Sequence, residues 1–517
     1  MFKVAARVAE KHGKGAILVM KPFYEKEIFD HKLQGALDRL KARIYTKVKD
    51  LDVEFAPSAE PVRFADRLNL TYKKIVPGEK WGGLFDCAWF HLTGKADPSC
   101  AGKKLVLLID LNGEGCVYDK NGSAVRGITC VNSEYDRSLG LPGKRVLQFA
   151  GKSNGGETVD LWIDAGCNDL FGILRENGTL KQAELAVVND KARDLYYDYW
   201  VLLDFLKATD RDTARYSQIL IALNEVGNLL YTYDDGELDR CAEILSVQLK
   251  KKAADTGLKL YATGHAHLDL AWLWPLRESR RKALRTFSTA MEMFDRYPFY
   301  ILGVSQPQQF EWVKREDPAL YEKIKQKVKE GRIEPQGAMW VESDLNVTSG
   351  ESLVRQVLYG KKFWREEFGQ EVKTAHLPDV FGFSGALPQI LAKSGVDSLI
   401  TIKMSWNKFN VFPYHTFNWR GIDGSEVLVH MPPEGTYNSA IAPRSVAAAE
   451  KKLSRPGLVR QRFNPVRDRR RRRRAGQRAF GTLEADRQPV GAFARRARVH
   501  ARIDRRNQEG PRQIENL

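Results

Sequence analysis

Three polar residues occur at alternate positions just past the middle of the chain. His265, His267 and Asp269 follow an apolar, strand-favouring stretch that includes Leu260 and Tyr261. Side chains of a strand alternate between its two faces, so residues spaced two apart share one face at the strand's end. Imidazole and carboxylate groups in this arrangement suit a divalent ion such as zinc, and three protein ligands with an open position are typical of a catalytic metal. The alternative is that hydrogen bonds at a strand–loop junction satisfy all three residues.

Two further strand-like segments also end in polar residues. The stretch 333–341 reads as a strand and is followed by Glu342 and Asp344, and another strand-like stretch ends in His376 and Asp379. Because the carboxyl ends of parallel strands meet at one edge of a sheet, we expect these side chains to gather there.

Strand and helix patterns alternate in this half of the chain, which predicts a parallel sheet with right-handed crossovers. The predicted strands are 300–305, 333–341 and 398–403, and the predicted helices are 276–297, 317–330, 351–368 and 386–394. The third of these helices should end at Gly369, a typical helix-stop residue.

Four sequence words carry a resemblance to a known family. They are GHAHLDLAWLWP (264–275), MWVESDLNVTSGESLVRQ (339–356), LPDVFGFSGALPQIL (377–391) and WRGIDGSEVLVHMPP (419–433). Together they resemble glycoside hydrolase family 38, the retaining α-mannosidases, and most closely its cytosolic and bacterial branch. A weaker likeness extends back to Gln34. Several long motifs in a fixed order are far more specific than any one of them.

The resemblance implies a metal-dependent, retaining hydrolysis of terminal α-mannosides in oligosaccharides, as part of mannose metabolism. By resemblance Asp344 is the nucleophile and also touches the metal, while His267 and Asp269 are metal ligands. His265 is implied as a neighbour that orients these ligands. The expected ion is zinc, with cobalt or another divalent ion as alternatives.

Other residues in the same words have both a functional and a structural interpretation. Trp272 matches an aromatic platform under the sugar ring, and the alternative is a core tryptophan. Asp379 matches a substrate-binding carboxylate, although such a residue also caps turns. Trp340 and Glu342 stay open between the two interpretations, because adjacent aromatic and acidic residues are common in sheets.

The chain divides into five expected regions. Short alternating runs with Asn-Gly turn signals predict an antiparallel β-rich domain, and a helical period predicts a linker after it. The resemblance adds that the catalytic domain is an incomplete seven-stranded, parallel α/β barrel. The expected regions are a leader (1–33), the β-rich domain (34–193), the helical linker (194–255), the catalytic domain (256–453) and a tail (454–517).

Composition indicates a large soluble enzyme in the cytoplasm. No run of about 18 apolar residues is present, so no membrane partner is expected, and the first twenty residues lack a signal-like apolar stretch. Six cysteines with irregular spacing are expected to be buried free thiols. The expected partner is the oligosaccharide substrate, with homo-oligomers in the intact family.

The net charge of +17 comes mainly from the tail. Residues 454–517 contain 19 arginines and no lysine against six acidic residues, and Arg469–Arg474 is unbroken. Such a block is typical of a basic arm that binds nucleic acid. A non-catalytic protein whose tail binds nucleic acid or acidic surfaces is therefore the alternative function.

A reading-frame shift near Arg455–Gly457 explains the tail better, and it makes a nucleic-acid partner unexpected. Read one nucleotide later, synonymous codons for the tail permit a Gly-Asp-Gly-rich segment like that of the family. By resemblance the general acid lies in that segment, where this chain has Arg470 and Arg471, and His500 does not match the family's later metal-binding histidine. We therefore expect a carboxyl-terminally truncated mannosidase with impaired activity.

Overall fold

The computed structural model describes two compact units, and each is built from two segments of chain. The first unit comprises residues 1–44 and 190–253, and the second comprises 45–189 and 254–517. The described residues are 23–129, 144–168, 178–252, 260–407, 409–410, 412–437, 439, 441–453 and 483–484.

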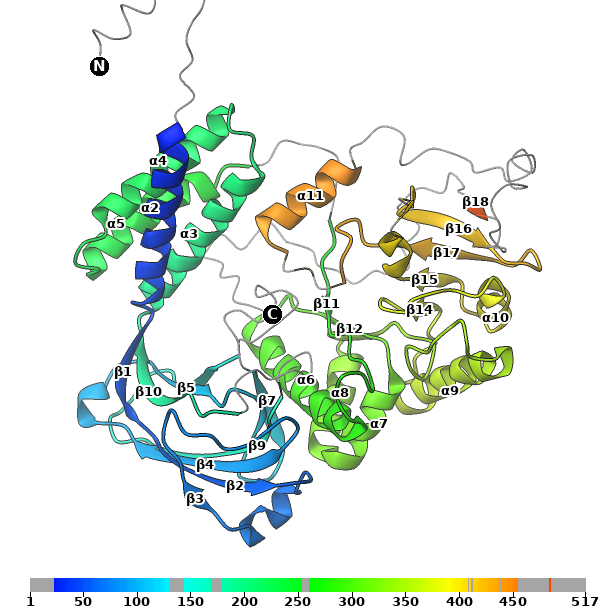
Figure 1. Ribbon diagram of the computed structural model, residues 1–517, viewed down its shortest axis with the longest axis horizontal. Coiled ribbons are helices and arrows are strands. Elements are labelled where there is room, and N and C mark those ends of the chain that lie inside the picture. Colours follow the sequence, from blue (N-terminus) through cyan, green and yellow to red (C-terminus); the bar gives the residue numbers. More distant parts are fainter. Residues whose placement is uncertain are drawn as a thin grey trace, which may run out of the picture. The chain divides into compact units, whose positions relative to one another are not determined.

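In the part that the structure describes, the first unit is a helical bundle (Figure 1). The helices α4 and α5 each begin at a side-chain cap, in which Thr213 and Asp234 accept hydrogen bonds from the backbone N–H groups of the first turn. Leucines such as Leu37 on the first helix and Leu223 on the third pack into one shared core. The helices are α2 (Phe23–Lys41), α3 (Asp190–Ala208), α4 (Ala214–Leu229) and α5 (Asp235–Leu249).

This bundle differs from the expected boundaries. The segment 194–255 was predicted to be a linker and 1–33 a leader, but α2 begins at Phe23 and packs with α3, α4 and α5. The partners of α2 are remote in sequence, so local periodicity did not reveal them.

The β-rich domain was predicted correctly as antiparallel. Its four-stranded sheet has the order β1 (Tyr45–Asp50), β10 (Gln182–Val188), β5 (Leu105–Asp110) and β8 (Val146–Ala150). Its six-stranded sheet has the order β3 (Lys73–Lys74), β2 (Asp52–Ser58), β4 (Cys87–Lys95), β9 (Thr158–Gly166), β6 (Glu114–Tyr118) and β7 (Ala124–Thr129). The short 3₁₀ helices η1 (Phe64–Asn69) and η2 (Pro98–Cys100) lie between strands.

The two sheets enclose one hydrophobic core. Leu107 and Ile109 of β5 meet Phe90 of β4 and Ile163 of β9 in this core. All six residues of β5 are buried, and on its other face Val106 and Leu108 form a small apolar cluster with Ala186 and Val188 of the neighbouring strand β10. Burial on both faces is consistent with the apolar run Leu105–Ile109 in this strand.

The α/β part contains two sheets of mostly parallel strands. The first is β11 (Gly264–His265), β12 (Leu302–Val304) and β13 (Ile333–Pro335), all parallel. In the second, β14 (Thr374–His376), β15 (Ser398–Ile400) and β17 (Glu426–His430) are parallel, and β16 (Thr416–Arg420) and β18 (Leu483–Glu484) add antiparallel strands. The N–H of Ala338, in the loop after β13, donates to the Thr374 carbonyl of β14 at 2.9 Å, so a backbone hydrogen bond links this loop to the second sheet. The expected single barrel of seven parallel strands stays a prediction.

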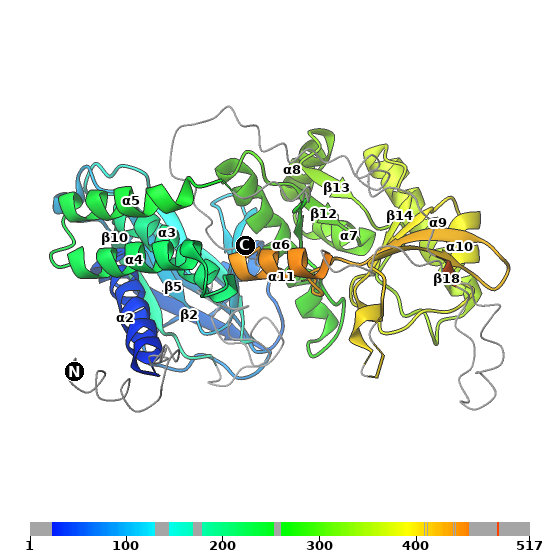
Figure 2. The same ribbon diagram turned by 90° about the horizontal axis from the view of Figure 1, so that it is seen from above.

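Helices accompany these strands, and α9 and α10 lie beside the second sheet in both views (Figures 1 and 2). Helix α9 ends where expected, with Gly369 in the left-handed conformation at φ 65°. The helix α7 was not predicted. The bounds are α6 (Leu276–Arg296), α7 (Pro307–Glu316), α8 (Pro318–Lys329), α9 (Gly350–Phe368), α10 (Leu387–Lys393), η3 (Lys403–Trp406) and α11 (Pro443–Leu453).

Several composition-based expectations can be compared with the described residues. Five cysteines are buried and free, as predicted, and Cys130 lies outside the described residues. None of the helices that the structure describes combines the length and hydropathy needed to span a bilayer. Apart from β18, the arginine-rich tail lies outside the described residues.

Candidate metal centre

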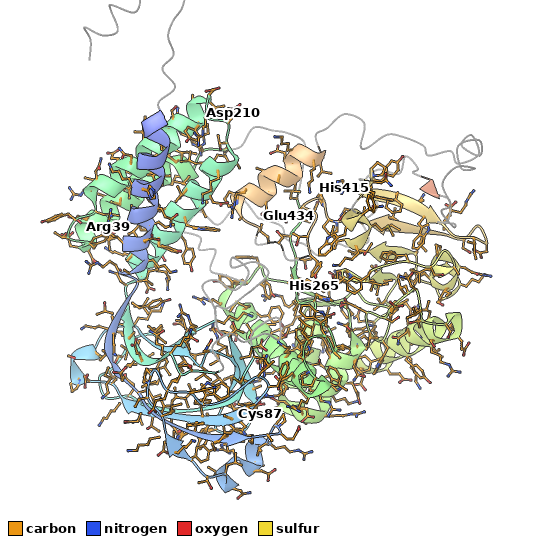
Figure 3. All side chains as sticks on the ribbon, viewed as in Figure 1. Arg39, Cys87, Asp210, His265, His415 and Glu434 are labelled. Atoms are coloured by element: carbon orange, nitrogen blue, oxygen red, sulfur yellow. The ribbon has the colours of Figure 1, made fainter. Side chains whose placement is uncertain are left out.

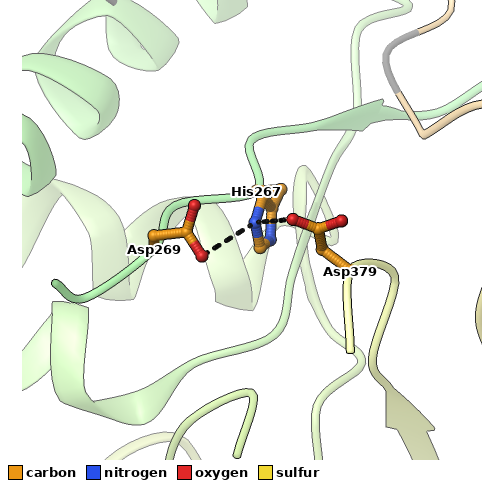
Figure 4. Close-up of side chains that lie close together, drawn as sticks. All are labelled: His267, Asp269 and Asp379. Carbon is orange, nitrogen blue, oxygen red and sulfur yellow. Dashed lines mark ion pairs between the residues drawn. The ribbon is translucent and has the colours of Figure 1, made fainter. Parts of the chain in front are cut away.

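Three acidic and imidazole groups converge where the first and second parallel sheets meet (Figure 4). His267 and Asp269 lie in the loop after β11, and Asp379 lies three residues after β14. One ligand atom from each residue falls within 4.8 Å of the other two. The His267 Nε2 atom is 3.5 Å from Asp269 Oδ1 and 3.3 Å from Asp379 Oδ2. We call these three residues the His267 cluster.

Glu342 binds the opposite nitrogen of the same imidazole. Its Oε2 lies 2.7 Å from His267 Nδ1, and its Oε1 accepts a hydrogen bond from Ser305 Oγ at 2.6 Å. The Glu342 side chain is only 5% exposed. With Nδ1 engaged, Nε2 is the nitrogen left facing Asp269 and Asp379.

Gln306 connects the loops that carry these residues. Its side-chain amide donates to the Leu268 carbonyl at 2.8 Å, and its side-chain oxygen accepts from the Glu342 N–H at 3.1 Å. Gln306 is buried, as a polar side chain can be when both ends are hydrogen-bonded. The loops after β11, β12 and β13 are thereby held in register at one edge of the sheet.

The electrostatics of the cluster favour a cation. Burial alone would lower the pKa of His267, but the carboxylates of Asp269, Asp379 and Glu342 outweigh burial and raise it to about 12. Nε2 is buried and has no well-formed hydrogen bond with any residue that the structure describes. The imidazole therefore sits among three carboxylates with one nitrogen directed at two of them. This donor set, one nitrogen and two carboxylate oxygens, fits zinc or a related divalent ion.

Lys403 holds the far side of Asp379. Its ammonium pairs with Asp379 Oδ1, which leaves Oδ2 directed at His267. Burial would raise the pKa of Asp379, but His267 and Lys403 outweigh it and lower the pKa. The same ammonium lies 3.2 Å from the ring centroid of Trp406 and 5.6 Å from that of Tyr437. Lys403 and Tyr437 were missed from the sequence, although Lys403 follows the carboxyl end of β15 as the other site residues follow their strands.

His265 lies apart from the ligands. Its Nδ1 is 3.3 Å from the Gly303 carbonyl, and its ring centroid is 4.4 Å from that of His376. Burial lowers the pKa of both histidines, so both are neutral near pH 7. Figure 3 labels His265, which stands at the end of β11. Its predicted role in orienting the ligands stays a prediction.

Asp344 was predicted as a metal ligand, but the structure brings Asp379 rather than Asp344 to His267 and Asp269 among the described residues. The Asp344 side chain is exposed, and its Oδ1 accepts hydrogen bonds from the N–H groups of Val347 and Asn346 at 2.8 and 2.9 Å. These backbone donors lower the pKa of Asp344. Its carboxylate is therefore ionised near pH 7, and its predicted role as nucleophile stays a prediction.

The two tryptophans singled out in the sequence differ in their surroundings. Trp272 is 44% exposed and meets Trp274 edge to face at 5.4 Å, so it is not an ordinary core residue. Trp340 packs edge-on against Phe363 and donates from Nε1 to Gln308 Oε1 at 3.1 Å, which is a structural role. The positions expected to encode the general acid, Arg470 and Arg471, lie outside the described residues.

Comparisons with known proteins agree with this architecture. Residues 257–464 match the model of the glycosyl hydrolases family 38 N-terminal domain, and residues 46–186 match that of the alpha-mannosidase jelly roll domain. The two matches correspond to the α/β part with its His267 cluster and to the antiparallel sandwich.

Curated relatives support the same assignment. The chain is 34% identical to alpha-mannosidase G of Dictyostelium discoideum, over 79% of this chain and 37% of that protein. It is 32% identical to human alpha-mannosidase 2C1, over 84% of this chain and 41% of that protein. It is also 32% identical to an alpha-mannosidase of Saccharomyces cerevisiae, over 72% of this chain and 35% of that protein. The chain thus spans about two fifths of the length of these relatives, and it belongs to glycosyl hydrolase family 38.

Proposed function

We propose that this chain is the amino-terminal part of a metal-dependent α-mannosidase that removes terminal α-mannosyl residues from oligosaccharides. The observation that carries the proposal is the His267 cluster, which lies in the domain that matches family 38. His267 Nε2 and one carboxylate oxygen each of Asp269 and Asp379 would hold the ion. Zinc is the expected ion, and cobalt is the alternative. The bound ion would act as a Lewis acid that holds and polarises the sugar's hydroxyl groups.

The nucleophile in this proposal is Asp344. A retaining glycosidase needs an ionised carboxylate that attacks the anomeric carbon and a second carboxyl group that protonates the leaving oxygen. The backbone N–H groups that bind Asp344 Oδ1 keep the carboxylate ionised, and its exposure leaves Oδ2 available to a substrate. The exposed ring of Trp272, three residues after Asp269, is the proposed platform for the sugar.

In this proposal, protonation of the leaving oxygen is the step that is impaired in this chain. The segment expected to supply the general acid carries Arg470 and Arg471 instead of an acidic residue. General acid assistance typically contributes 10²–10⁴-fold to the rate. We therefore propose slow turnover, with aryl mannosides that have an activated phenolate leaving group hydrolysed before natural mannosides. We further propose that the two parallel sheets belong to a seven-stranded α/β barrel.

Hydrolysis of an activated aryl α-mannoside by the purified chain tests the proposal. Activity should be lost on removal of metal with a chelator and should return with zinc or cobalt. Asp344→Asn should abolish the activity. The matched control is Asp423→Asn, because Asp423 is an exposed aspartate that makes the same kind of turn hydrogen bond, to the Ser425 N–H at 3.0 Å. Activity that survives both metal removal and Asp344→Asn would rule the proposal out.

A further inference from the structure

The loop that carries Asp269 is fixed by the helix that follows it. The indole Nε1 of Trp274 donates to the Asp269 carbonyl at 3.1 Å and to Ser279 Oγ at 3.0 Å. Ser279 Oγ donates in turn to the Leu270 carbonyl at 2.7 Å. Ser279 is fully buried in the first turns of α6, and Trp274 is 7% exposed. The backbone of Asp269 is therefore placed by the position of one indole ring.

A buried cation covers the face of that ring. The Lys282 ammonium on α6 lies 4.3 Å from the Trp274 ring centroid, and its side chain is 6% exposed. A desolvated ammonium over an indole is attracted by the ring quadrupole, and this attraction is stronger in a buried site than at the surface. Lys282 thus fixes where the Trp274 ring can lie.

The partner of this cation belongs to the sandwich. Lys282 Nζ pairs with Glu114 on β6, and the same carboxylate oxygen accepts from Arg285 at 2.9 Å and from Asn168 at 2.6 Å. Glu114 is 3% exposed and Asn168 is fully buried. Three donors converge on this one buried oxygen, so the position of the Lys282 ammonium is set by a strand of the other domain.

We propose that Glu114 and Lys282 are positioning residues for Asp269 and that they act through Trp274. The path runs from Glu114 to Lys282, from Lys282 to the Trp274 ring, and from the indole N–H to the Asp269 carbonyl. By this path the jelly-roll sandwich sets the metal affinity of the catalytic domain. The inference rests on the metal site of the proposed function and extends that site to a second domain.

The alternative is that these charges only fasten the sandwich to α6. The same interface supplies a matched control, the pair between Arg281 and Asp164 of β9, with Nε–Oδ2 and Nη2–Oδ1 distances of 3.0 and 2.6 Å. This pair is also buried, and it is joined to Glu278 and makes no contact with the Trp274 ring. It reaches Glu114 only indirectly, through Glu278 and Arg285. Loss of either pair should lower stability, whereas only loss of the first should alter the metal site.

Zinc affinity of the full 517-residue chain, measured by competition with a chromophoric chelator, separates the two possibilities. Lys282→Met should weaken zinc binding by about tenfold, the lower end of the range for residues that orient metal ligands. Lys282→Arg keeps the charge over the ring and should restore most of the affinity. Asp164→Asn should lower the unfolding midpoint without changing zinc affinity. Of these three variants, only Lys282→Met should shift the visible spectrum of bound cobalt relative to the wild type.

Glu114→Gln gives a second test that keeps the shape of the carboxylate and removes its charge, should Lys282→Met fail to fold. It should weaken zinc binding in the same direction. Wild-type affinity in folded Lys282→Met or Glu114→Gln protein would overturn the inference while leaving the metal site intact. Equal weakening in Asp164→Asn would overturn it too, because the effect would then be general loosening. A wild-type chain that binds no zinc would remove the proposed metal site and this inference together.

Discussion

Glu342 decides which nitrogen of His267 faces the cluster. An imidazole can bind a metal through either nitrogen, and the hydrogen bond at the other nitrogen fixes the choice. Glu342 occupies Nδ1 at 2.7 Å and is itself held by Ser305, so the ring cannot turn without breaking a buried ionic hydrogen bond. The sequence alone left the role of Glu342 open. Its ionic hydrogen bond with His267 explains why an acidic residue stands at this position.

Replacement of Glu342 by glutamine should weaken zinc binding by about 10- to 100-fold, because the amide lacks the charge that raises the basicity of the imidazole. Chelator competition on the purified chain measures the effect. Glu351→Gln is the control, since Glu351 is an exposed acid of α9 that pairs with Arg355 on the next turn. Equal zinc affinity in the Glu342→Gln variant and the wild type would show that Glu342 does not orient the ligand.

Placement at strand ends grouped these side chains from the sequence, while the metal roles of His267 and Asp269 came from the family resemblance, which gave Asp379 a substrate-binding role. His267, Asp269 and Asp379 each follow the carboxyl end of a strand, and sheet topology brings such ends together. The position of Asp379, rather than Asp344, beside His267 and Asp269 was not predictable in this way, because it depends on how the loop after β13 turns. Asp344 uses its carboxylate to cap that turn. Lys403 was missed since nothing local marks its ion pair with Asp379.

At the scale of elements, the loop after β13 depends on a close approach of helix α9. A Cβ atom added to Gly360 would lie 2.3 Å from the Ala338 carbonyl oxygen, inside the backbone of that loop. The predicted strand 333–341 is regular only as far as Pro335, and residues 336–342 turn to carry Glu342 to His267. Periodicity predicted α9 well, but it could not show that its middle needs a residue without a side chain.

The substitution Gly360→Ala tests this close approach, because it would stabilise an isolated helix but should destabilise the protein if the contact is present. In an isolated helix the change would stabilise by about 1 kcal/mol. Here we expect it to destabilise by about 1–3 kcal/mol, because backbone must move to admit the methyl group. Urea unfolding measures the difference. Gly350→Ala, at the start of the same helix with no atom within 4 Å of the added methyl group, should be neutral or stabilising. A stabilising effect at both positions would contradict the close approach.

Helix α7 shows why periodicity fails for some elements. Its sequence contains Gln309 among residues of high polarity, and Gln309 is nevertheless buried. Helix α2 was missed for a different reason, since its apolar stripe meets partners on α3, α4 and α5. The local spacing of apolar residues indicates which face of an element is buried. It does not indicate which other element covers that face.

At the scale of the whole molecule, buried charges join the sandwich to the α/β part. Glu278 of α6 is completely buried. Burial would raise its pKa, but Arg281 and Arg285 outweigh burial and lower it to about 2 from the ordinary 4.5. A carboxylate with a depressed folded-state pKa adds stability above its unfolded-state pKa, and the protein loses that stability as the pH falls toward the folded-state value.

The second unit should therefore lose stability between about pH 4.5 and pH 2 more steeply in the wild type than in Glu278→Gln. The variant should be less stable at pH 7, because two guanidinium groups lose a buried partner. Urea midpoints from tryptophan fluorescence at pH 7, 5, 4 and 3 measure both effects. Parallel pH profiles for the two proteins would show that Glu278 titrates alike in the folded and unfolded chains.

The division of the helical unit into two chain segments has a consequence for synthesis on the ribosome. Residues 42–189 separate α2 from α3, so α2 emerges long before the helices that cover it. At about 5–20 residues per second, the delay is roughly 7 to 30 seconds. During that time Leu33, Leu37 and Leu40, all buried in the finished bundle, have no native partner. This apolar stripe therefore stays uncovered while the whole sandwich is translated, and exposed apolar surface of this kind promotes aggregation of a nascent chain.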